Sequence, residues 1–146
     1  MEGNNENSKT LRDARMQDAR EVALEAASAF YRKKGMDIRM YRVDDTTVIT
    51  EYYVICVGRS TTQIRALADE AIYRLGLCGV NSLRTEGESG SEWMLVDFGD
   101  VILHIFTPDA RTYYNLERLL NPEGEVDLTD HFTQLAEKLK SEDSTQ

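Results

Sequence analysis

The chain contains few of the residues from which covalent frameworks and metal sites are built. Its 146 residues include two cysteines, two histidines and two prolines. Cys56 lies in an apolar, strand-like run, and Cys78 stands beside a glycine. A disulfide framework or a zinc site would need more such residues at closer spacing. We therefore expect both thiols to be reduced packing residues.

Long hydrophobic runs are also absent from the sequence. No stretch approaches the roughly 18 apolar residues that a membrane span requires. The acidic, polar start Met1–Asn7 has neither the pattern of a signal peptide nor that of a transit peptide, so we expect a cytoplasmic protein. The apolar fraction of 41% is ordinary for one soluble domain with its own core.

Positive charge is scarce as well. The net charge is −9, and residues 121–146 hold seven acids against two bases. No basic stripe is visible along the rest of the sequence, which argues against phosphate-driven or sequence-specific binding of nucleic acid. A basic protein is a better-matched partner, because opposite charges speed encounter.

The sequence lacks the common fingerprints of phosphoryl-transfer enzymes. No Asp-x-Asp pair stands on a predicted strand, where it could hold magnesium. The turn Gly58–Ser60 before a predicted helix resembles an anion-binding turn, but it has a single glycine and no lysine. Helix capping alone explains Ser60.

The most informative segment that is present is Trp93–Phe106, with the sequence WMLVDFGDVILHIF. It predicts a β-hairpin whose two-residue loop, Gly99-Asp100, suits a type II′ turn. In that register the facing pairs on one side are Phe98 with Val101, Val96 with Leu103, and Met94 with Ile105. The other side carries Trp93, Leu95, Asp97, Ile102, His104 and Phe106. The first face can pack against a core, whereas the second is either buried with its polar groups paired or offered to a partner.

The polar residues of that second face allow several interpretations. Asp97 and His104 are diagonal neighbours, about 7–8 Å apart at the backbone. They could form an acid-oriented general base, although the sequence places no nucleophile beside them; a hydrogen-bonded pair or two separate interface residues are the alternatives. Trp93, the only tryptophan, is either a core residue or an interface anchor, since tryptophan is enriched at binding hot spots.

The remaining chain predicts helices that alternate with strands. Ser60 and Gln63 form a capping box, and Thr107 and Pro108 suit the first positions of a later helix. Strands are expected at Ile38–Val43, Thr47–Val57 and Val80–Arg84; helices are expected from about Leu11 to Lys34 with Gly35 as C′ residue, from Ser60 to about Leu75, from Thr107 to Leu120 with Tyr113 inward, and at Asp130–Lys140. The continuous apolar run Tyr52–Val57 is typical of a strand buried on both faces.

This order of elements predicts a mixed β-sheet with packed helices, of the α/β or α+β class. We expect one domain over residues 11–120, a disordered segment at residues 1–10, and an acidic, partly helical tail at residues 121–146. Arg111 is expected to be a solvated charge, and His131 a surface residue of the tail.

Several segments, in order, resemble the ribosomal silencing factor family, also known as the Iojap-like family. They are Ile49–Arg65, Glu86-Gly87, the hairpin 93–106 and Arg111–Glu117. The residues that match the family pattern are Trp93, Asp97, Gly99, Asp100, His104, Arg111, Tyr114, Leu116 and Glu117. The chain departs from the pattern at Leu120, near which the family often has a second aromatic residue, and in its longer acidic tail.

The resemblance implies a fold related to nucleotidyltransferases without their catalytic acids, a homodimer when free, and neither enzymatic activity nor a cofactor or metal. It implies binding to the large ribosomal subunit through that subunit's protein fourteen, on the intersubunit face. Bound there, the protein would obstruct joining of the small subunit and repress translation when nutrients run short. It gives the docking role to Trp93, Met94, Asp97, Asp100, His104 and Tyr114. A nucleotidyltransferase-like enzyme and a dimeric scaffold without a ribosomal partner are the alternatives.

Overall fold

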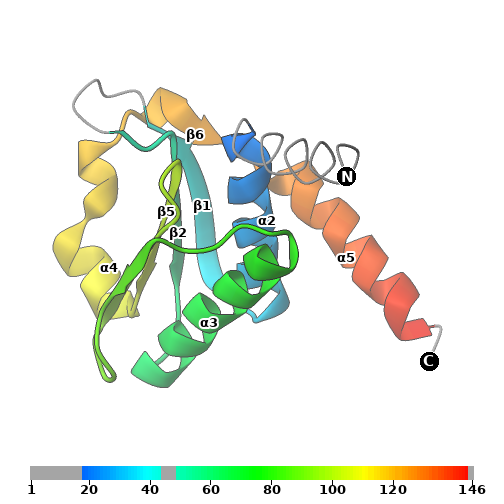
Figure 1. The fold of residues 1–146 in the computed structure, drawn as a ribbon, viewed down its shortest axis with the longest axis horizontal. Coiled ribbons are helices and arrows are strands. Elements are labelled where there is room, and N and C mark those ends of the chain that lie inside the picture. Colours follow the sequence, from blue (N-terminus) through cyan, green and yellow to red (C-terminus); the bar gives the residue numbers. More distant parts are fainter. Residues whose placement is uncertain (1–17, 44–48, 145–146) are drawn as a thin grey trace, which may run out of the picture.

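The computed structural model describes residues 18–43 and 49–144, and its centre is one six-stranded sheet (Figure 1). The strands are β1 (Met36–Arg42), β2 (Tyr52–Val57), β3 (Arg84–Glu86), β4 (Trp93–Asp97), β5 (Val101–Phe106) and β6 (Glu125–Val126). Their order in the sheet is β3-β4-β5-β2-β1-β6. The pair β2–β5 is parallel and the other pairs are antiparallel. The predicted mixed sheet is therefore confirmed.

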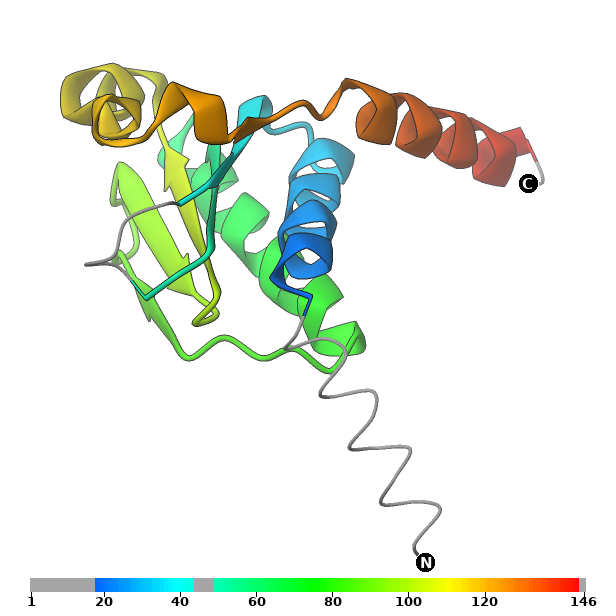
Figure 2. The ribbon, with the colours of Figure 1, turned by 90° about the horizontal axis from the view of Figure 1, so that it is seen from above.

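Helices cover both faces of the sheet. Helices α2 (Ala19–Arg32) and α3 (Thr61–Leu77) lie on one face, and α4 (Pro108–Tyr114) lies on the other (Figure 1). Short 3-10 turns follow at Leu116–Leu119 and Pro122–Gly124. Helix α5 (Thr129–Ser144) packs near α2 at its start and then runs away from the sheet (Figure 2). No helix in the described part of the chain is long and apolar enough to cross a membrane.

Two apolar layers hold the helices to the sheet. The larger layer joins α2 and α3 to side chains such as Val54, Met94 and Leu103. The smaller layer lies under α4, where Ile55 and Phe106 are fully buried. Strand β2 contributes to both layers, which confirms the expected strand buried on both faces and explains why its sequence does not alternate.

The hairpin has the predicted register. Trp93 lies opposite Phe106, Met94 opposite Ile105, and Val96 opposite Leu103. Gly99 has a φ of 89°, the positive value that the first position of a type II′ turn requires.

The end of α2 differs from the prediction in one residue. Lys34, not Gly35, has the left-handed conformation, with a φ of 62°. The Gly35 N–H donates to the Phe30 carbonyl at 2.8 Å, and the Lys34 N–H donates to the Tyr31 carbonyl at 3.0 Å. These two bonds form a Schellman motif. The expected start of this helix at Leu11 and the expected disorder of residues 1–10 lie outside the described residues.

The predicted strand at Val80–Arg84 is wrong. Strand β3 begins only at Arg84, which pairs with Asp97. The preceding segment closes the end of α3, because the Val80 N–H donates to the Leu75 carbonyl at 2.8 Å. The Val80 N–H is therefore bonded to the end of α3, and pairing with β4 begins at Arg84.

Three further expectations are wrong. The helix from Thr107 stops at Tyr114, since Asn115 takes a left-handed φ of 46°. Cys78 is exposed and is not a packing residue. His131 is only partly exposed, because its Nε2 lies 2.7 Å from the Ser28 hydroxyl of α2.

The turn between β2 and α3 yields a stability prediction. A Cβ at Gly58 would lie 2.8 Å from Ile64 Cγ2 and 3.1 Å from the Ile64 backbone nitrogen. We expect Gly58→Ala to lower the free energy of unfolding by about 1–3 kcal/mol, as overpacking does. Chemical denaturation measures the change.

The matched control is Gly76→Ala within α3, where a Cβ meets nothing within 4 Å. This substitution should raise the free energy of unfolding by about 0.5–1 kcal/mol, because alanine favours the helix. Equal effects of the two substitutions would contradict the packing described around Gly58.

Candidate functional site

The outer face of the hairpin, under α4, carries a group of rings in mutual contact, most of them tilted or edge-on to one another. We name Trp93, His104, Phe106, Tyr114 and Tyr53 the aromatic cluster. The distance between ring centroids is 4.6 Å for Trp93 and Tyr114, and 5.0 Å for Trp93 and Phe106. It is 4.9 Å for Tyr53 and His104. Hairpin register brings three of these rings together, and α4 places Tyr114 over them. Each ring pair contributes about 0.5–1.5 kcal/mol beyond its buried area.

A hydrogen bond within the aromatic cluster fixes the state of His104. The Trp93 indole N–H donates to His104 Nδ1 at 3.1 Å. Nδ1 therefore acts as an acceptor, which assigns the ring as neutral with its proton on Nε2. Nε2 itself is buried and has no hydrogen-bond partner in the described part of the chain. Burial lowers the pKa of His104 from 6.5 to about 4.

Asp97 does not pair with His104. Its carboxylate lies 3.2 Å from Arg84 Nε, and its other oxygen accepts the Gly99 N–H at 2.7 Å. Asp97 thus builds the hairpin turn, four residues along β4 from Trp93. The two residues of the proposed acid–base pair are separate, so the catalytic interpretation lacks the contact that would orient the imidazole.

The six residues predicted for docking do not form one patch. Trp93, His104 and Tyr114 come together in the aromatic cluster, with His104 buried beneath the others at 4% exposed. Met94 is 3% exposed and faces the core of α2 and α3. The docking role predicted for Met94 is therefore wrong, because alternation along β4 points its side chain away from the outer face.

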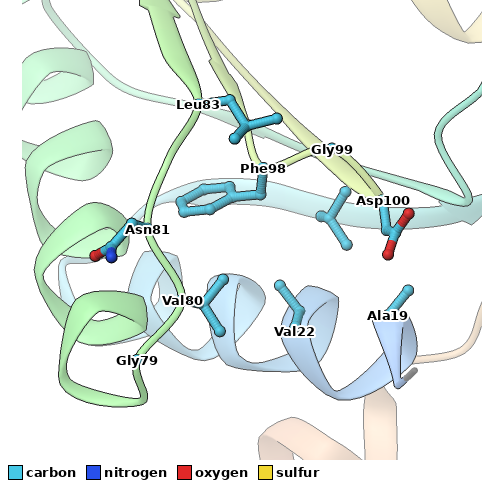
Figure 3. Close-up of a pocket in the computed structure, with 10 residues that line it drawn as sticks. Ala19, Val22, Gly79, Val80, Asn81, Leu83, Phe98, Gly99 and Asp100 are labelled. Atoms are coloured by element: carbon cyan, nitrogen blue, oxygen red, sulfur yellow. The ribbon is translucent and has the colours of Figure 1, made fainter. Parts of the chain in front are cut away.

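Asp100 lies on the other side of the hairpin from the aromatic cluster. Figure 3 shows it at the rim of a groove beside Ala19 and Val22 of α2. The groove encloses about 360 Å³, and Phe98 and Leu83 line its floor and edge. Asp97 and Asp100, three positions apart in the sequence, therefore face different surroundings.

A buried arginine that the sequence interpretation placed in solvent holds α4 in position. Arg111 is 8% exposed and lies 3.0 Å from Glu117 through both Nε and Nη2. Its Nη1 also donates to the Asp37 carbonyl at 3.2 Å. This Arg111 clamp ties α4, the following 3-10 turn and the start of β1 together. The signal in the sequence was the match of both Arg111 and Glu117 to the family pattern.

Exposed apolar side chains lie on α4 and on the 3-10 turn that follows it. Tyr113 is 81% exposed, which makes the inward orientation predicted for it wrong, while Tyr114 turns toward Trp93 and is 44% exposed. Leu119 is 70% exposed. Three of the seven exposed large hydrophobic residues in the described ranges thus lie within one seven-residue stretch. Contiguous exposed apolar side chains are one feature of protein-interaction surfaces.

The part of the chain that the structure describes contains no cluster of side chains that could hold a metal ion. Nowhere in residues 18–43 and 49–144 do three or more His, Cys, Asp or Glu side chains gather in a way that could hold an ion. The arrangement that the site offers is a partly exposed set of rings in mutual contact.

Comparison with known proteins decides the family. A family model described as "Ribosomal silencing factor during starvation" matches residues 16–146. The chain belongs to the ribosomal silencing factor family. The match includes the acidic segment 121–146, from which β6 and α5 are built.

Similar proteins of this family come from bacteria and from organelles. The Bacillus subtilis protein named "Ribosomal silencing factor RsfS" is 36% identical over 105 residues, which are 72% of this chain and 86% of the relative. The maize "Protein Iojap, chloroplastic" is 30% identical over 73% of this chain and 46% of the relative. The mouse "Mitochondrial assembly of ribosomal large subunit protein 1" is 28% identical over 80% of this chain and 51% of the relative.

Solved structures agree with this family and fold. A crystal structure of a Chromobacterium violaceum protein is 36% identical, with a TM-score of 0.62 over 71% of this chain and 84% of the other. A Bacillus halodurans crystal structure is 31% identical, with a TM-score of 0.60 over 77% of this chain and 99% of the other.

His104 yields a pH prediction. The pKa of His104 is lowered in the folded state. Between about pH 6.5 and pH 4, the imidazole is therefore protonated in the unfolded chain but neutral in the folded chain. The free energy of unfolding should therefore fall by up to about 3 kcal/mol as pH drops through that window. Denaturation at a series of pH values measures this fall.

Carboxylates also titrate in part of that window, so the comparison is between variants. We expect His104→Gln to flatten the pH dependence between about pH 6.5 and pH 4 relative to the parent protein. Parallel profiles for the parent and His104→Gln would contradict the buried, neutral imidazole.

Proposed function

We propose that this protein silences ribosomes by binding the large subunit through its aromatic cluster and blocking the approach of the small subunit. The observation that carries the proposal is the partly exposed pair Trp93 and Tyr114, with Tyr113 against Tyr114, in a chain of the ribosomal silencing factor family. The names of the bacterial relatives and of the mouse relative both refer to the ribosome.

The geometry suits a docking surface that is organised before binding. Trp93 is held by its bond to His104, and the Arg111 clamp fixes the helix that carries Tyr114. Tryptophan and tyrosine are the residues most enriched at binding hot spots. A surface that is already rigid loses little conformational entropy on association.

Charge favours a basic partner. The chain carries a net charge of −9, which speeds encounter with a positively charged protein. The family resemblance names protein fourteen of the large subunit as that partner, and we propose it here. Asp97, at the turn end of the same face, would add an acidic contact.

The mechanism is occlusion and involves no reaction. A domain docked on the intersubunit face covers area that the small subunit must contact, so translation is repressed for as long as it stays bound. We also propose, from the family resemblance, a cytoplasmic location and a homodimer in the free state.

Truncation of the central ring tests the docking surface. We expect Trp93→Ala to weaken binding to purified large subunits by about 30-fold, which corresponds to a hot spot of about 2 kcal/mol. Fluorescence or sedimentation titration measures the affinity, and thermal unfolding confirms that the variant is folded.

The matched control is Tyr73→Ala. Tyr73 is an exposed aromatic residue, 59% exposed, on α3 and thus on the opposite face of the sheet. This control should bind as the parent protein does. Parent-like affinity of a folded Trp93→Ala variant would remove the aromatic cluster from the interface.

A further inference from the structure

A second surface lies at the corner where α2 ends and α3 begins. We name Lys33, Lys34 and Arg59 the basic corner. We propose that the basic corner binds the phosphate backbone of ribosomal RNA beside the protein on which the aromatic cluster docks. This inference rests on the proposed function, because it needs the protein to be seated on the large subunit.

The corner is assembled by one side chain. The Gln63 amide nitrogen donates to the carbonyls of Lys33 at 3.4 Å and Lys34 at 3.3 Å. The Gln63 amide oxygen accepts the Arg59 N–H at 2.6 Å. Residues about 25 positions apart in the sequence are thereby held together, which explains why no basic patch was visible along the chain.

The Schellman motif adds rigidity to this corner. Lys34 occupies its left-handed position, and Gly35 packs so closely that a Cβ would lie 3.1 Å from the Phe30 carbonyl oxygen and 3.2 Å from Leu67. The backbone under the two lysines therefore has little freedom, and all three cations are exposed.

The three cations are not neutralised within the protein. None of them forms an ion pair with any residue in the described ranges. Five arginines elsewhere in those ranges are paired with carboxylates: Arg39, Arg65, Arg74, Arg84 and Arg111. Other cations in those ranges, such as Arg20, Lys138 and Lys140, also lack an ion pair there, so the corner is distinguished by three unpaired cations that the Gln63 hydrogen bonds bring together from two segments. A cluster of unpaired positive charge in a chain of net charge −9 points to an anionic partner at this place.

The basic corner adjoins the docking surface. Arg59 follows Gly58, whose N–H donates to the carbonyl of Phe106, a member of the aromatic cluster, at 2.9 Å. Lys34 stands three residues before Asp37, which contacts Arg111 of α4. The basic corner and the Trp93–Phe106 pair therefore lie at the same end of the sheet, the corner on the side of α2 and α3 and the pair on the side of α4. A particle that binds the aromatic cluster and extends past this end of the sheet meets the basic corner.

RNA fits this position better than an acidic protein segment. Proteins on a ribosomal surface are set among RNA, so a domain centred on one of them has phosphates around its rim. Each phosphate contact contributes about 0.7–0.9 to the slope of log affinity against log salt concentration. Three cations make fewer phosphate contacts than a protein needs to bind free nucleic acid. The basic corner would therefore add to the affinity of protein docking and would not replace it.

The experiment compares two variants that lose the same charge. One replaces the corner by Lys33→Gln, Lys34→Gln and Arg59→Gln. The control carries Arg20→Gln, Lys138→Gln and Lys140→Gln, three exposed positions at the other end of α2 and on α5. Affinity for purified large subunits is measured from low to moderate salt at fixed magnesium, and hydroxyl-radical footprinting records which RNA nucleotides are protected.

We expect the corner variant to bind more weakly at low salt, with a slope reduced by about 2–3. It should also lose a set of RNA protections that the parent and control proteins retain. A corner variant with the parent slope and footprint would overturn the inference, and so would a reduced slope when the parent protects no RNA, since the anion would then be a protein carboxylate. Failure of the parent to bind large subunits would instead overturn the proposed function.

Discussion

The pairing of β4 with β5 around Gly99 determines what this protein presents to a partner. Side chains alternate between the faces of a strand, so a shift of one residue in register would move every side chain of a strand to the opposite face. The two-residue loop fixes the register in which Met94 and Leu103 enter the core. The same register places Trp93, His104 and Phe106 together on the outer face.

The outer face is held by polar contacts that a typical core does not contain. His104 is buried with one nitrogen bonded to Trp93 and the other without a partner in the described residues. An unsatisfied buried polar atom costs about 1–3 kcal/mol, and residues that break local rules in this way concentrate at functional sites. The Arg111 clamp is a second such feature, since it buries a charge in order to fix a short helix. Both features stabilise one arrangement of the exposed rings.

Elements that depend on local chemistry could be predicted from the sequence. The hairpin register followed from Gly99-Asp100, and the start of α3 followed from Ser60, whose hydroxyl accepts the Gln63 N–H at 3.1 Å. The burial of β2 on both faces followed from its unbroken apolar run. In these cases the residues that decide the structure are neighbours in the sequence.

Features that depend on contacts between distant segments could not be predicted. Tyr114, not Tyr113, packs against Trp93, which belongs to the hairpin. The burial of Arg111 depends on Asp37, and the basic corner depends on Gln63 reaching the end of α2. Met94 shows a different error, because alternation along the strand already put it on the core face, and the family resemblance alone gave it a docking role.

The central claim is that a rigid aromatic surface without chemistry keeps two ribosomal particles apart. Its most direct test is sucrose-gradient sedimentation of purified large subunits that have been saturated with this protein before small subunits are added. The protein should travel with the large subunit, and the small subunit should sediment alone. Intact ribosomes forming at saturating protein, or large subunits that carry none of it, would contradict the account.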